Sequence, residues 1–186
     1  MIKIIRVLIS LFLCITILTF TACGEKVKEK EKEKPLNIAV STKDDIFELK
    51  MYIDKDMYTN DEIINCYATL EYIGEEDSIA VYSSDPLVGF SLKDDKYFDG
   101  GYIVNDVLIT TTLEKGKIVR FNYVKSGGWT AEDPNADFYK NFFSEKELIL
   151  PIGTYEISTT IACSLDENDI LDSQYKNLVS AYITVK

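Results

Sequence analysis

Histidine is absent from this chain of 186 residues, and arginine occurs only twice. The absence of histidine excludes Ser-His-Asp and Cys-His catalysis, histidine-based zinc sites and histidine pH switches. Positive charge is also scarce, because 20 Lys and Arg face 31 Asp and Glu and give a net charge of -11. This excess argues against nonspecific nucleic-acid binding, which needs cations to neutralise phosphates. Hydrophobic residues nevertheless make up 46% of the chain, which is enough for a folded core.

No hydrophobic run reaches the length of a membrane-spanning helix. Residues 7–20 form an uncharged stretch of 14 residues, whereas a spanning helix needs about 20. Lys3 and Arg6 precede this stretch, and the small residues Thr21 and Ala22 follow it. The pattern predicts a signal peptide over residues 1–22, with an uncleaved N-terminal anchor as the alternative. Either interpretation places the rest of the chain outside the cytoplasm.

The residues 20–23, Phe-Thr-Ala-Cys, resemble a bacterial lipobox. The resemblance implies cleavage before Cys23 and transfer of a diacylglycerol to its thiol. A modified Cys23 would hold the protein on the extracytoplasmic face of the cell membrane, since two or more acyl chains anchor stably. The strong preference for Lys over Arg, with abundant Ile and Asn, resembles the composition of low-GC Gram-positive bacteria.

Lysine and glutamate alternate through residues 24–34. Like charges at i,i+4 disfavour a helix, and almost nothing apolar is present to bury. We therefore expect residues 23–35 to be the lipidated cysteine with a flexible, charged tether. The domain from residue 36 to 186 keeps 13 of the positive and 27 of the negative charges. Anionic headgroups should repel it, so the tether holds it near the membrane but not on it.

The domain at residues 36–186 alternates apolar and polar residues with a period of two, which predicts β-strands. Short turns rich in Gly, Asp and Pro separate the strands. We expect an all-β, immunoglobulin-like antiparallel sandwich of 7–9 strands with one short helix in a loop. The predicted strands cover residues 47–53, 66–72, 79–83, 87–92, 103–112, 118–123, 155–163 and 179–185.

One segment departs from this period. Asp133 and Pro134 are typical of a helix start, and four aromatic residues follow on one helical face. We expect a helix over residues 134–144 that packs against the sandwich, with at least two of the four rings buried. The alternative is a partner-binding surface, formed by Trp129, Phe138, Tyr139, Phe142 and Phe143.

The sequence Leu150-Pro-Ile-Gly153-Thr-Tyr155 resembles the tyrosine corner of Greek-key sandwiches. The glycine lets the chain turn, and the tyrosine hydroxyl can reach back to the upstream backbone while its ring packs in the core. Leu150, Gly153 and Tyr155 are therefore expected to be structural residues.

A wider resemblance rests on the order of four short motifs between residues 47 and 163. They are Asp-Glu-Ile-Ile at 61–64, Leu-Glu-Tyr-Ile-Gly at 70–74, Leu-Glu-Lys-Gly at 113–116 and the corner motif at 150–155. Together they resemble the immunoglobulin-like domain of the intracellular proteinase inhibitor family, and the same layout recurs in envelope lipoproteins of Gram-positive bacteria. The resemblance implies a fold, and no reactive-loop residue can be carried over.

Two cysteines remain in the domain, Cys66 and Cys163. Both lie on the inward face of a predicted strand, either as buried thiols or as a disulfide between the sheets. Asp133, Asn135 and Asp137 match the first ligands of a calcium loop, but Phe138 and Ser144 replace its glycine and glutamate. Helix capping by Asp133 explains the pattern better. We expect no metal, no cofactor and no catalytic residue.

The sequence therefore predicts a membrane-anchored, extracytoplasmic lipoprotein whose domain is a non-catalytic binding or structural module of the cell envelope. Its partners would be the membrane, through the lipid anchor, and a protein or cell-wall component, but not nucleic acid. A surface proteinase inhibitor is the alternative. A small carboxylate-dependent hydrolase would need two carboxylates facing each other across a cleft.

Overall fold

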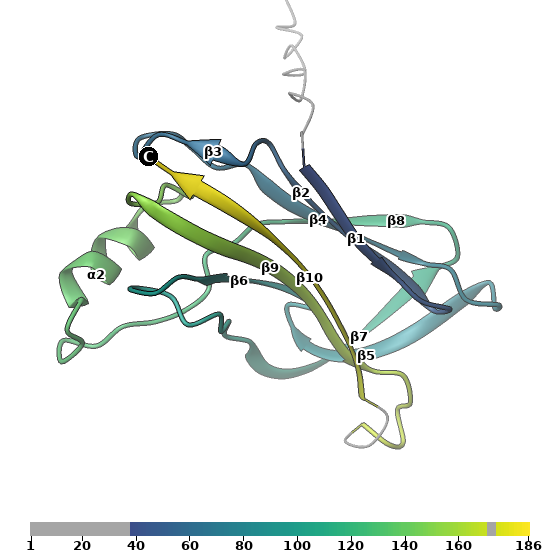
Figure 1. Ribbon diagram of the computed structural model, residues 1–186. Helices are drawn as coiled ribbons and strands as arrows, with labels where there is room; N and C mark the ends of the chain where they lie inside the picture. The colour runs from purple at the N-terminus through teal and green to yellow at the C-terminus, as the bar shows by residue number, and fades with distance from the viewer. Residues whose placement is uncertain (1–37, 171–173) are drawn as a thin grey trace, which may run out of the picture. The chain divides into compact units, whose positions relative to one another are not determined.

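The computed structural model describes residues 38–170 and 174–186 (Figure 1). All of them belong to the unit that runs from Lys34 to Lys186. The predicted signal peptide at residues 1–22, the lipidation site Cys23 and the tether at residues 23–35 lie outside the described residues. Within the described part, no helix is long and apolar enough to cross a membrane.

The domain is an all-β sandwich with one short helix, as the sequence predicts. One sheet has the order β1-β2-β4-β8, from strands Ile38–Lys43, Phe47–Ile53, Cys66–Tyr72 and Ile118–Asn122. The second sheet has the order β3-β10-β9-β5-β7. In this order its strands are Met57–Tyr58, Gln174–Val185, Gly153–Ser164, Ser78–Asp85 and Asn105–Glu114. A sixth strand, β6 (Val88–Lys93), also pairs with β9. The described residues form ten strands, more than the seven to nine expected. The two additional strands are β1 and β3, which the sequence pattern did not mark. Every pair is antiparallel except β3 with β10.

The core lies between the two sheets and follows directly from the period of two. Strands β2 and β4 alternate between buried and half-buried residues along their whole lengths. Phe47, Met51 and Leu70 are at most 1% exposed. Ile157 and Ile161 of β9 and Ile183 of β10 close the core from the opposite sheet.

The tyrosine-corner residues hold the turn into β9. The Tyr155 ring is 1% exposed, and its hydroxyl donates a hydrogen bond of 2.9 Å to the carbonyl of Pro151. Leu150 is buried beside it, whereas Gly153 is half-buried. Burial raises the pKa of Tyr155 to about 12, so its hydroxyl keeps its proton and remains a donor.

Cys66 and Cys163 are both buried free thiols. Of the two alternatives that the sequence left open, the structure therefore has the thiols and not the disulfide. Burial raises the pKa of Cys66 to about 12 and that of Cys163 to about 11, which keeps both protonated and unreactive.

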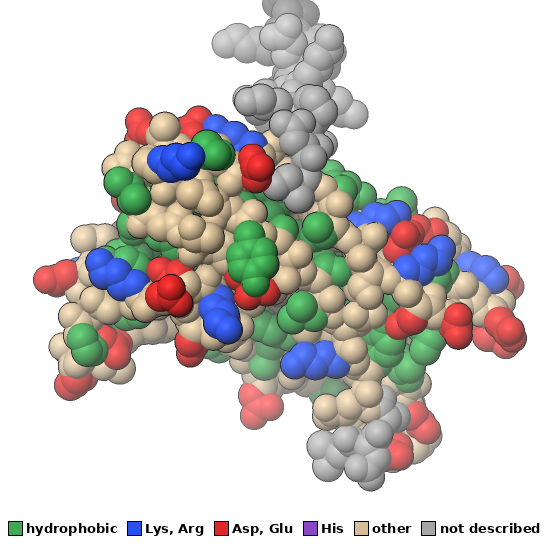
Figure 2. Space-filling model, in the orientation of Figure 1, with side chains coloured by type: hydrophobic (Ala, Val, Ile, Leu, Met, Phe, Trp, Pro, Cys, Tyr) green, Lys and Arg blue, Asp and Glu red, His purple; other side chains and the backbone are tan. Residues whose placement is uncertain are grey.

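Strand β6 lies off the main strand order of the second sheet. Strands β5 and β6 follow each other along β9, and β7 pairs with β5 only. Among the described strands, β6 pairs with β9 only. Its other edge forms a single bridge in the described part of the chain, between Lys93 and Asp99 of the β6–β7 connection. The α-helix lies near β6 and β9 (Figure 1). On the face in Figure 2, acidic and basic side chains are interspersed, so the acidic excess is not concentrated there.

Candidate binding cleft

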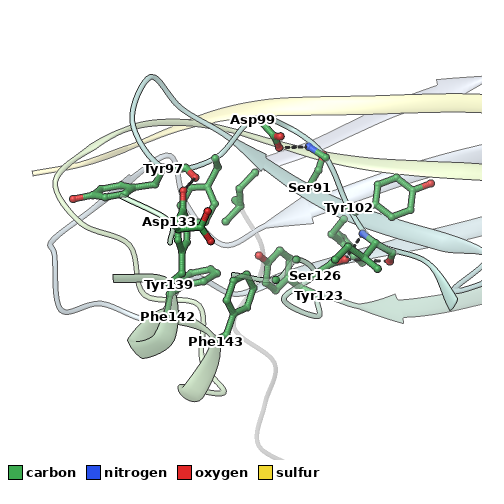
Figure 3. Close-up of a pocket in the computed structure, with 17 residues that line it drawn as sticks. Ser91, Tyr97, Asp99, Tyr102, Tyr123, Ser126, Asp133, Tyr139, Phe142 and Phe143 are labelled. Carbon is green, nitrogen blue, oxygen red and sulfur yellow. Dashed lines mark hydrogen bonds between the residues drawn. The ribbon is translucent and has the colours of Figure 1, made fainter. Parts of the chain in front are cut away.

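A cleft of about 410 Å³ lies beside β6. Its walls come from β6, the β6–β7 connection, the β8–α2 connection and helix α2 (Ala136–Ser144) (Figure 3). Eight aromatic side chains dominate the lining: Phe90, Tyr97, Phe98, Tyr102, Tyr123, Tyr139, Phe142 and Phe143. The volume is within the range of small-molecule sites.

Helix α2 begins two residues later than predicted, because the expected cap does not form. Its N-cap is Asn135, which makes no side-chain capping hydrogen bond. The Asp133 carboxylate instead accepts a hydrogen bond of 2.6 Å from the backbone N–H of Thr130. Asp133 therefore organises the turn before the helix, and it also lines the cleft.

The expectation that at least two of the four helix aromatics are buried is wrong. Only Phe142 is buried, at 7% exposed, whereas Phe138, Tyr139 and Phe143 are half-buried. Tyr139 and Phe143 line the cleft, so part of each ring is not covered by other side chains. Trp129 is 40% exposed and does not line the cleft.

Neither alternative for the aromatic segment therefore holds alone. Phe138 stacks on Tyr97 of the β6–β7 connection, with ring centroids 3.8 Å apart, and Phe142 packs on Phe98. These contacts dock the helix against the sandwich. Tyr139 and Phe143 remain available to whatever enters the cleft.

Asp94 shapes the β6–β7 connection from within. One oxygen of its carboxylate accepts backbone N–H hydrogen bonds from Lys96, Tyr97 and Phe98, at 3.2, 2.7 and 2.7 Å. An Asp that bonds its own following backbone is a recognised turn device. It fixes the two aromatic residues that the helix then packs against.

Three further hydrogen bonds join the walls of the cleft to each other. The Tyr139 hydroxyl donates to the carbonyl of Tyr97 at 2.6 Å, which joins the helix to the β6–β7 connection. The Ser126 hydroxyl accepts from the N–H of Ile103 at 2.7 Å and donates to the carbonyl of the same residue at 3.1 Å (Figure 3). The two long connections therefore meet at Ser126, 23 residues from its partner.

Lys125 holds the C-terminal end of the helix. Its Nζ donates to the carbonyls of Phe142 and Glu145 at 2.6 and 2.8 Å, and lies 4.2 Å from the centre of the Phe142 ring. The last turn of the helix has no basic residue of its own, so Lys125 supplies the cation that a helix C-terminus favours. Burial lowers the pKa of Lys125, against a smaller opposite effect of Glu145 and Glu147.

Two glycines allow the walls to approach. A Cβ on Gly127 would come within 2.7 Å of the Phe143 ring, and the φ of Gly127 is +144°, which side chains rarely tolerate. A Cβ on Gly89 of β6 would lie 2.3 Å from the ring of Tyr102. Sequence reasoning gave Asp94, Lys125 and Ser126 no role in a site, although an Asp three residues before an aromatic pair is a visible turn signal.

The described residues contain no group of three or more Cys, Asp or Glu side chains that could hold a metal ion. No protein-family model matches the chain, and no curated protein or solved structure matches it. The fold and the cleft are therefore the basis for any assignment of function.

Proposed function

We propose that this protein is a membrane-anchored, extracytoplasmic lipoprotein whose domain is a non-catalytic binding module of the cell envelope. The observation that carries the binding role is the cleft of about 410 Å³ with its eight aromatic side chains. Aromatic side chains supply large contact area at recognition sites. The anchoring role rests on the lipobox resemblance around Cys23.

The lining argues for binding rather than catalysis. Its two carboxylates are Asp99 and Asp133. Asp99 is exposed and Asp133 is half-buried, whereas a general acid among carboxylates sits in an enclosed apolar site. The cleft lining contains two serines, Ser91 and Ser126, but no cysteine, lysine or histidine, so neither serine has beside it in the lining the histidine or lysine that usually activates a serine nucleophile.

The anchor is tested by metabolic labelling with an alkyne fatty acid in a Gram-positive host. We expect the wild-type chain to incorporate the label and to fractionate with membranes, and Cys23→Ser to remain an unlabelled precursor. Cys66→Ser is the matched control, because its thiol is buried in the domain and should not affect labelling. Labelling of Cys23→Ser at wild-type level would refute the anchor.

The binding role is tested by a thermal-stability screen with soluble cell-wall fragments, short peptides and small organic solutes. A ligand that binds only the folded state raises its stability, by about 2.7 kcal/mol at a hundredfold excess over Kd. Gly128→Trp should fill the cleft, since the nearest atom to a Cβ there is 3.9 Å away. We expect at least one compound to stabilise the wild type but not Gly128→Trp. No compound with that selectivity would refute the binding role.

A further inference from the structure

The charged residues that line the cleft are both acidic. Of the 17 residues that line it, two are acidic, Asp99 and Asp133, and none is Lys or Arg. Histidine is absent from the chain. A cavity with this lining favours a positively charged occupant, since opposite charge is attracted most strongly where water is partly excluded.

Each of the two carboxylates accepts a backbone hydrogen bond with one oxygen and, among the described residues, keeps the other oxygen as a free acceptor. One oxygen of Asp99 accepts the N–H of Gly101 at 2.9 Å, and one oxygen of Asp133 accepts the N–H of Thr130 at 2.6 Å. Within the described part of the chain, the second oxygen of each carboxylate has no hydrogen-bond partner, and neither group forms an ion pair. Each carboxylate is thus held in place with an oxygen left for a ligand.

The aromatic rings around the cleft already attract cations. The ammonium of Lys96 lies 4.6 Å from the centre of the Tyr97 ring, and that of Lys125 lies 4.2 Å from the centre of the Phe142 ring. Both lysines lie outside the lining. Tyr139 and Phe143 are half-buried, and no ammonium group of the described residues lies over either ring. A cation over a partly desolvated ring gains up to about 2 kcal/mol.

We infer that the cleft binds a quaternary ammonium group, the trimethylammonium of a small choline-like solute. This inference rests on the proposed function, because it names the ligand class of the same site. A quaternary ammonium has no N–H to satisfy and is recognised by ring faces and a nearby negative charge. Tyr139 and Phe143 provide the rings, and Asp133 provides the charge, while the rest of the cleft volume accommodates the remainder of the solute.

The test compares choline with its neutral isostere 3,3-dimethyl-1-butanol, in which carbon replaces the charged nitrogen. Binding to the full chain is followed by ligand-observed NMR titration in a nonionic sugar detergent, which adds no ammonium group of its own. We expect choline to bind at least tenfold more tightly than the isostere. Equal affinity for the two would overturn the inference, because apolar contact would then explain all of the binding.

Three variants locate the effect. Asp133→Asn removes the charge and keeps the oxygen that accepts from Thr130, and should weaken choline binding about tenfold. Phe143→Leu keeps an apolar side chain without a ring and should weaken it several-fold. Glu132→Gln removes the same charge one residue away from Asp133 and outside the lining, and should leave the affinity unchanged. A wild-type affinity in Asp133→Asn would overturn the inference.

The outcome separates this inference from the proposed binding role. If choline fails to bind but another compound stabilises the wild type and not Gly128→Trp, the ligand class is wrong and the binding role stands. If no compound distinguishes the two proteins, both are wrong. Saturable choline binding that Gly128→Trp retains would place the cation elsewhere on the protein and would also refute the inference.

Discussion

Replacing Tyr155 by phenylalanine removes one oxygen and leaves the packing of the corner unchanged. The ring is 1% exposed, and the hydroxyl makes one hydrogen bond, of 2.9 Å, to the carbonyl of Pro151. The lost bond contributes about 0.5–1.5 kcal/mol net, and the carbonyl left without its donor adds a desolvation cost. We therefore expect Tyr155→Phe to lower the free energy of unfolding by about 1–2 kcal/mol.

The measurement is a denaturant titration of the full chain, with Tyr182→Phe as the matched control. Tyr182 is 66% exposed, and a surface substitution of this kind changes stability by no more than about 0.5 kcal/mol. An equal effect of the two substitutions would show that the Tyr155 hydroxyl contributes nothing and would refute the role of the corner.

The pH dependence of stability in wild type and Tyr155→Phe gives a second, independent check. Burial raises the pKa of Tyr155 from 10 to about 12 in the folded state. A group whose pKa is raised on folding contributes stability that is complete below the unfolded pKa and is lost as the pH rises through the folded value. The stability difference between wild type and Tyr155→Phe should therefore be constant up to about pH 9 and shrink between pH 10 and 12. A difference that grows over this interval would contradict the burial of the hydroxyl.

Two further predictions concern a cleft wall and a surface turn. Gly127→Ala should destabilise the protein by about 1–3 kcal/mol, the cost of a strained backbone, because the φ of Gly127 is +144° and a Cβ there would meet Phe143. In thermal unfolding, the control Gly128→Ala should keep the wild-type Tm. Equal Tm values for the two variants would refute the argument. For Asp44, burial raises the pKa, but hydrogen bonds from Tyr175 and from the N–H groups of Phe47 and Ile46 outweigh it and lower the pKa overall. Asp44→Asn should therefore cost stability at neutral pH and lose that effect as the pH falls through the lowered pKa, and a difference that persists in acid would rule this out.

The strands were predictable where one face is buried. Residues 47–53 and 66–72 have the predicted bounds, because their alternating pattern matches alternating burial in β2 and β4. Strand β3 has only two residues, too few to show a period. Strand β1 alternates only between exposed and half-buried residues, so its apolar face is weakly marked in the sequence. Residues 103–112 were predicted as a strand, although β7 is mostly exposed, because its β-branched residues favour strands with or without burial.

The cleft could not be predicted, although three of its eight aromatic residues, Tyr139, Phe142 and Phe143, were named from the sequence. Helical spacing placed Phe138, Tyr139, Phe142 and Phe143 on one side of a helix, but it could not show that part of this side faces a cavity. That outcome depends on contacts between distant segments, such as Tyr139 with Tyr97 and Ser126 with Ile103. Sequence periodicity reports the local environment of a strand or helix and contains no information on which loops meet.

The exposed edge strand β7 gives the acidic charge a physical role. Val107, Leu108 and Ile109 are 51%, 60% and 39% exposed, and no described strand pairs with the outer edge of β7. An edge strand that exposes three consecutive apolar residues is a template for pairing between molecules, although Asp106 beside them already opposes it. Two copies of a chain with a net charge of -11 repel each other before their edges can meet. The acidity therefore acts as colloidal protection, and high salt, which shortens the screening length to about 3 Å at 1 M, removes it.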